Sequence, residues 1–200
     1  MRFVDRAIAD AGLLPIVEAR RAGNMEHVHE SADVLREADL LVLGAIADGL
    51  RASEIGDVVR VHHDPAAADN VLWVPATDDH QPRDLDVLRE VALARIFSSR
   101  EVHVGVDWSR LGLELAQVAL GFGASELRGA ITKKNGLPIL AGDARKVKGA
   151  KLVDLASIKR REIAALVRYA GRVPSFTDAR AEDSGSRLAH PEDIRVRLHP

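Results

Sequence analysis

The sequence of 200 residues contains no cysteine. Disulfide bonds and metal sites built from thiolates are therefore excluded. A 4Fe–4S cluster in particular has no ligands in this chain, because such clusters depend on soft sulfur donors. A chain without cysteine fits a reducing compartment, and we expect a cytoplasmic protein without an iron–sulfur cofactor.

Long apolar runs and an excess of one charge are also missing. No stretch approaches the roughly 18 apolar residues that span a membrane. Acidic residues interrupt the apolar positions of the first helical pattern, and such interruption is not typical of a signal peptide. The formal net charge of −2 leaves no electrostatic footprint for nucleic acid. Hydrophobic residues nevertheless make up 46% of the chain, enough for a core. We expect a soluble globular protein with no nucleic-acid or membrane partner.

Residues 1–55 have the spacing of helices. Apolar residues recur every three to four positions, and charged residues stand between them. From Val28 onward the pattern predicts two helices with a break near Ala38–Asp39. Ser31 or Asp39 is positioned to cap a helix start.

Strands and helices alternate in the next part of the chain. Runs rich in β-branched residues predict four strands, at 58–61, 70–74, 101–106 and 126–131. Helical patterns lie between the second and third strands and between the third and fourth, and another covers 156–170. Such alternation predicts a parallel sheet with right-handed crossovers. The expected fold class is α/β, either a partial (β/α) barrel or a small open parallel sheet of about four strands, with N-terminal helices and a C-terminal helix.

We divide the chain into four segments by composition and pattern. They are an N-terminal helical segment at 1–55, a βαβ core at 56–132, a loop and C-terminal helix at 133–176, and a polar tail at 177–200. Four strands cannot close a barrel, and open edges rich in valine favour association. We therefore expect a homodimer or pairing with a paralogue.

Three stretches of the sequence resemble one family of enzymes. They are EADLLVLGAIADGLRASEIGDVVRVHHD, NVLWVPATDDHQPRDLDVLREVALARIF and VHVGVDWSRLGLELAQVALGFGASELRGAI. The tail IKRREIAALVRYAGRVPSFTDAR resembles the family's terminal pattern I…AGR.P..RD. The family comprises the radical S-adenosylmethionine enzymes of futalosine-route menaquinone synthesis and of deazaflavin-cofactor synthesis, of the aminofutalosine synthase and dehypoxanthine futalosine cyclase type.

The third stretch is the most specific, and the departure from the family is equally clear. Family residues recur at matching spacings at Trp108, Gly112, Ala116, Gln117, Ala119, Leu120, Phe122, Gly123, Ala124, Leu127 and Gly129. The family places a CxxxCxxC loop and further βα units after the strand that here ends at His62. This chain passes almost directly to Asn70, so the resemblance implies a shortened relative without the cluster loop.

Candidate binding residues follow the predicted strands, because ligands of open parallel sheets gather outside the carboxyl ends of the strands. His62, His63 and Asp64 could hold a divalent metal, although their spacing matches no known metal motif and solvated loop residues are the alternative. The candidate ligand-binding residues are Asp78, His80, Arg95, Asp107, Trp108 and Arg110.

Several of these candidates have a structural alternative. Asp107 stands where a helix cap is needed. Arg95 lies on an apolar helix face and could be a structural tie to a buried carboxylate or carbonyl rather than a ligand for a substrate carboxylate. His103 lies inside an apolar strand, where a hydrogen-bonded core histidine is the simpler interpretation. No serine stands in a nucleophile motif, so no nucleophilic site is predicted.

Three functions remain open at this point. The resemblance implies a non-catalytic or accessory relative that binds a small molecule, such as a futalosine-like or other aromatic carboxylate metabolite. The His and Asp residues allow a metal-dependent hydrolase or isomerase as an alternative. A structural subunit of a full-length paralogue is the third.

Overall fold

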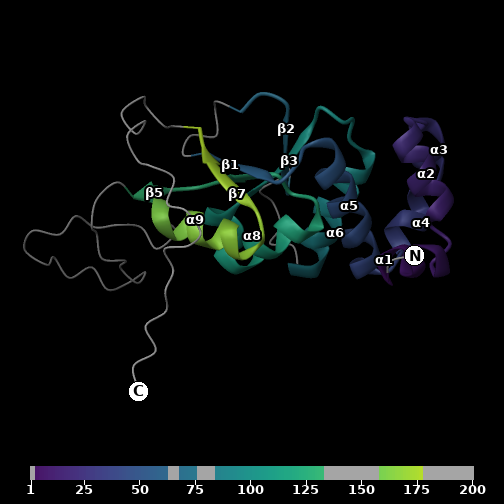
Figure 1. Ribbon diagram of the computed structural model, residues 1–200, viewed down its shortest axis with the longest axis horizontal. Coiled ribbons are helices and arrows are strands. Elements are labelled where there is room, and N and C mark those ends of the chain that lie inside the picture. Colours follow the sequence, from purple (N-terminus) through teal and green to yellow (C-terminus); the bar gives the residue numbers. More distant parts are fainter. Residues whose placement is uncertain (1–2, 63–67, 76–83, 133–157, 178–200) are drawn as a thin grey trace, which may run out of the picture.

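The computed structural model describes residues 3–62, 68–75, 84–132 and 158–177. The first part is helical, as the spacing predicts, and its five helices gather at one end of the molecule (Figure 1). Their bounds are α1 Phe3–Asp10, α2 Leu14–Ala22, α3 Met25–Glu30, α4 Ala32–Glu37 and α5 Leu40–Glu54.

The predicted break near Ala38–Asp39 is confirmed. Asp39 caps α5, because its carboxylate accepts from the backbone N–H groups of Leu41 and Val42. The prediction of a single helix before this break is wrong, because Ser31 separates α3 from α4. Its hydroxyl donates back to the carbonyl of His27 and makes no cap bond to α4.

The expected α/β class is confirmed by an open sheet of five parallel strands in the order β2-β3-β4-β1-β7. Four of the strands lie where the sequence predicts them. The bounds are β1 Val58–His62, β2 Val71–Val74, β3 His103–Asp107, β4 Glu126–Arg128 and β7 Val173–Phe176.

The fifth strand, β7, corrects the prediction of about four. Pro174 argues against a strand because it has no N–H for a ladder bond. β7 lies at the edge of the sheet and pairs with β1 alone, so Pro174 needs no partner on its other side. The sheet remains open in the described residues, as in a partial β/α barrel. Dimerisation and the division into four segments remain predictions.

Helices line one side of the sheet (Figure 1). They are α6 Asp84–Phe97, α7 Trp108–Leu111, α8 Leu113–Ala119 with the short 3-10 helix Leu120–Phe122, and α9 Arg160–Tyr169. A separate pair, β5 Ile131–Thr132 and β6 Ile158–Lys159, precedes α9. The C-terminal helix therefore begins at Arg160, later than predicted.

The two faces of the sheet differ in character, because successive strand residues point to opposite sides. Val59, Val61, Val104, Val106 and Leu127 are buried in the core that the sheet shares with the helices. The alternate positions of the same strands carry the set Arg60, His62, His103, Asp107, Glu126 and Arg128. We call this second side the polar face.

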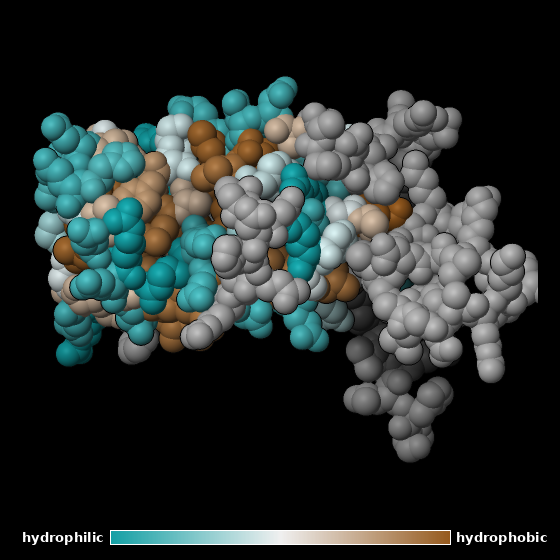
Figure 2. All heavy atoms as spheres, turned by 180° about the vertical axis from the view of Figure 1, so that it is seen from behind, coloured by the Kyte–Doolittle hydropathy of each residue, from teal (hydrophilic) through white to brown (hydrophobic). Residues whose placement is uncertain are grey.

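In the described part of the chain, no helix is both long enough and apolar enough to cross a bilayer. Seen from behind, hydrophilic side chains cover most of the end that holds the N-terminal helices, and apolar side chains show in smaller areas between them (Figure 2).

Candidate functional site

A fully buried carboxylate lies at the centre of the polar face. Glu126 has no solvent exposure and contacts three basic side chains. Arg60 donates from Nε to Oε1 at 2.6 Å, and His62 Nε2 lies 2.5 Å from Oε2. His103 Nδ1 lies 2.8 Å from Oε1. Glu126, Arg60, His62 and His103 form the Glu126 cluster, which joins β1, β3 and β4.

Strand register brings these residues together. Glu126 is the partner of Arg60 on β1 and of Gly105 on β3, and side chains directly opposite on one face are close neighbours. His62 and His103 each lie two residues from such a partner, on the same face. A basic or acidic residue at every second position of an apolar strand is the sequence signal that could have found this cluster.

The environment keeps Glu126 ionised. Burial alone would raise the pKa of this carboxyl, but hydrogen bonds from His103, His62 and Arg60 outweigh it and lower the pKa below its ordinary value of 4.5. A buried charge needs partners of this kind. The cluster therefore holds a negative charge that orients two imidazole rings.

The second ring nitrogen of His62 also has a partner. Nδ1 lies 3.2 Å from the hydroxyl oxygen of Thr177, which follows β7 at its carboxyl end. The same oxygen lies 3.3 Å from the carbonyl oxygen of Val61. Thr177 is exposed. Its hydroxyl contacts the His62 imidazole, which in turn contacts the buried Glu126 carboxylate. Sequence reasoning missed Thr177, because it placed this residue in the polar tail.

Trp73 packs beside the cluster because β3 carries a glycine there. A Cβ on Gly105 would lie 2.5 Å from the Trp73 ring and 3.0 Å from Glu126 Cβ. Trp73 meets the His62 ring edge-on, with centroids 5.7 Å apart. The Arg128 guanidinium stacks over the Trp73 ring, 4.4 Å from its centroid, and its Nε donates to Asp107 at 3.0 Å. The sequence analysis did not single out Trp73 or Arg128.

Three of the predicted ligand-binding residues lie at the carboxyl end of β3. Asp107 caps α7 by accepting from the N–H of Ser109, and its other oxygen binds Arg128. Trp108 is buried, its indole N–H has no hydrogen-bond partner among the described residues, and a side chain on Gly129 would overlap its ring. Arg110 is exposed, with Nη1 3.5 Å from the carbonyl oxygen of Pro75.

Arg95 lies apart from these residues, among the helices. It is fully buried, donates to the carbonyl of Val102 and lies 3.7 Å from Glu54. Burial lowers the pKa of its guanidinium, although Glu54 opposes that effect. These contacts match the structural alternative for Arg95, a tie to a buried carboxylate and a carbonyl. A role in ligand binding remains a prediction.

The predicted metal site is only partly described. His63 and Asp64, like the candidate ligand residues Asp78 and His80, lie outside the described residues. His62 is described, and both of its ring nitrogens contact protein groups. The described ranges contain no group of three or more His, Asp or Glu arranged to hold a metal ion. A divalent metal, and with it the hydrolase or isomerase alternative, remains a prediction.

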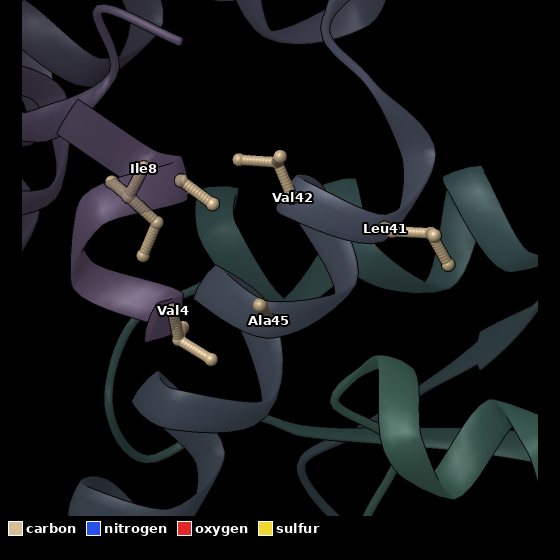
Figure 3. A pocket seen from close by; sticks show the side chains of 6 residues that line it. Val4, Ile8, Leu41, Val42 and Ala45 are labelled. Carbon is tan, nitrogen blue, oxygen red and sulfur yellow. The ribbon is translucent and has the colours of Figure 1, made fainter. Parts of the chain in front are cut away.

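An apolar pocket of about 220 Å³ lies elsewhere, between α1 and α5 (Figure 3). The described residues of its lining carry no titratable or nucleophilic side chain, so they offer packing surface and no chemistry. The lining residues are Val4, Ala7, Ile8, Leu41, Val42 and Ala45.

Comparison with known proteins supports the family resemblance. An aminodeoxyfutalosine synthase from Thermus thermophilus is 32% identical over 95 residues, which are 48% of this chain and 23% of that protein. A cyclic dehypoxanthine futalosine synthase from Streptomyces coelicolor is 30% identical over 90 residues, 45% of this chain and 20% of that protein. The chain thus matches less than a quarter of the length of these curated relatives.

No family model matches the chain. The two matches nevertheless cover about half of it, and both relatives belong by name to the futalosine route. About half of this chain is therefore similar in sequence to part of each of these two futalosine enzymes, in agreement with the resemblance.

Proposed function

We propose that this protein is an accessory, ligand-binding relative of the futalosine-pathway enzymes, and that it holds a small anionic aromatic metabolite on the polar face of its sheet. The observation that carries the proposal is a pair of arginines on this face, Arg60 bound to Glu126 and Arg128 stacked over the ring of Trp73. Arg60, Arg128 and Trp73 are the residues that we propose contact the ligand.

Each arginine is held by a carboxylate in a way that leaves donors for a ligand. Arg60 bonds Glu126 and Arg128 bonds Asp107, in both cases through Nε. The Nη groups of Arg60 and Arg128 donate no hydrogen bond to any of the described residues. The Arg60 side chain is 37% exposed and that of Arg128 is 20% exposed, so a ligand can reach both. A guanidinium held in this way is ready to bind a carboxylate or phosphate.

The aromatic ring suggests the rest of the ligand. Trp73 is half-buried and presents an apolar surface beside the Arg128 guanidinium, which suits a planar group that carries a negative charge. The names of the two relatives point to futalosine-type metabolites as the first compounds to test. The absence of cysteine supports binding without cluster chemistry, because this chain supplies no thiolate for the iron.

Calorimetric titration with aminodeoxyfutalosine tests the proposal. We expect saturable binding by the unaltered protein and about tenfold weaker binding by R128Q, which loses a charged hydrogen-bond donor. R36Q is the matched control, because Arg36 is an exposed arginine paired with Asp33 on α4, away from the sheet.

Tryptophan fluorescence locates the bound ligand. The chain has two tryptophans, so W108F leaves Trp73 as the sole reporter and W73F leaves Trp108. The ligand should change the emission of W108F and leave that of W73F unchanged. Absence of heat and of any emission change at ligand concentrations up to about 1 mM would contradict the proposal.

A further inference from the structure

The geometry points to a second activity: we infer that the hydroxyl of Thr177 is a nucleophile activated by His62 and accepts an acyl group from an activated ester or thioester. The three groups in line are the Thr177 hydroxyl, the His62 imidazole and the Glu126 carboxylate. This inference does not rest on the proposed function, since it concerns a different ligand and the contact between His62 and Thr177.

The positions of the protons follow from the contacts. Glu126 is ionised, so the proton in its 2.5 Å contact with His62 is on Nε2. In a neutral imidazole the other nitrogen, Nδ1, is then an acceptor. Thr177 Oγ1 lies 3.2 Å away and is a hydroxyl, so it can donate its proton to Nδ1.

The carbonyl of Val61 competes for the same proton. It lies 3.3 Å from Thr177 Oγ1, slightly farther than His62 Nδ1. The hydroxyl can rotate between these two acceptors. When it points to Nδ1, the arrangement has a nucleophile, a base and a group that orients the base, which is the logic of a hydrolase triad.

Access and rigidity suit this role. Thr177 is exposed, whereas His62 is 3% exposed and Glu126 is fully buried, so a reagent meets the hydroxyl while the base stays fixed. Arg60 and His103 hold the Glu126 carboxylate from the other side.

The acyl transfer balances within this set of groups. Oγ1 of Thr177 attacks the carbonyl carbon of the ester, a new C–O bond forms, and the hydroxyl proton moves to His62 Nδ1. The bond from the carbonyl carbon to the leaving alcohol then breaks, and His62 returns the proton to that alcohol. Glu126 keeps its charge and stabilises the imidazolium during the transfer. The product is an ester of Thr177.

Acetylation by p-nitrophenyl acetate tests the inference on the full chain. Release of nitrophenolate is followed by absorbance, and peptide mass spectrometry locates the acetyl group. We expect acetyl-Thr177 in the unaltered protein and in T177S, and none on that peptide in T177V. S99A is the control, because Ser99 is an exposed hydroxyl residue outside the line of three groups.

The base is tested by H62N, which should lower acetylation of Thr177 by about 10²-fold. Because His62 is buried and H62N can fail to fold, the unaltered protein in urea is the second comparison, and it too should lose the label. Equal labelling of Thr177 in the native protein and in urea would overturn the inference. So would acetyl groups confined to lysines.

Discussion

Two buried glutamates in this protein each lie near three basic side chains, but the types of side chain differ. Glu54, at the end of α5, is 7% exposed and binds Arg20, which donates from Nη1 and Nη2 at 2.8 and 3.1 Å. Arg95 and Arg100 lie 3.7 and 3.9 Å away. Glu126 is instead held by two imidazoles and one arginine.

The partners explain the difference in role. Arginine stays protonated at any pH that a folded protein meets, whereas imidazole gains and loses a proton near neutrality. Arg20 also donates to the carbonyls of Ile96 and Ser98, so Glu54 and its arginines tie α2 and α5 to the end of α6. We conclude that the Glu54 cluster holds helices in place, while the Glu126 cluster also contacts the exposed hydroxyl of Thr177 through His62.

The largest effect is expected from E54Q. It leaves Arg20 and Arg95, both buried, without the carboxylate that compensates them, and breaking one partner of a buried ion pair costs about 4 kcal/mol. Urea denaturation measures the free energy of unfolding. E30Q is the matched control, because Glu30 is an exposed glutamate on α3. A loss for E54Q no larger than that for E30Q would show that the Glu54 cluster is not structural.

The same substitution at the other cluster, E126Q, should cost less, about 2 kcal/mol at neutral pH. Arg60 is partly exposed and keeps water as a partner when the carboxylate is lost.

Acid should bring the stabilities of E126Q and the unaltered protein closer together. The pKa of Glu126 lies below its ordinary value of 4.5, so its stabilising contribution is complete above pH 4.5 and is lost as the pH falls through the folded-state pKa. The free energy of unfolding should therefore decline less steeply below pH 4.5 in E126Q than in the unaltered protein. Identical acid slopes would contradict this interpretation.

The smallest effect is expected from G105A, at about 1.5 kcal/mol. The new Cβ would lie 2.5 Å from the ring of Trp73 and force it off the polar face, and overpacking of this kind carries a moderate cost. Thermal unfolding and the emission of Trp73 in a W108F background measure the change. G49A is the matched control: Gly49 is in α5 with no atom near its Cβ position, so alanine there should be neutral or stabilising. A Trp73 emission equal to that of G49A would show that Gly105 does not position the ring.

Local pattern was sufficient for most of the fold. The spacing of apolar residues located the helical segment and four strands, and Asp39 was identified as a cap from its place before an apolar run. Each of these features depends on neighbours within a few residues. The strand that contains Pro174 could not be predicted in this way, because its formation depends on an edge position beside β1.

The candidate site was harder to predict for the same reason. The sequence analysis placed His62 and Asp107 at strand ends, where the structure has them, but it assigned His103 to the core and did not consider Glu126, Trp73 or Thr177. Polar residues at alternate strand positions are visible in the sequence, yet their partners lie on other strands. Asp78 and His80 remain untested predictions.

The sequence by itself determined what this protein lacks and which segments form helices and strands. Composition excludes thiolate chemistry, and hydrophobic periodicity selects local structure. Tertiary structure decided which charges meet: Glu126 reaches His62 across 64 residues of sequence, and Thr177 reaches it across 115. Strand order and register bring these groups together, and both depend on pairing between distant segments that share no local signal.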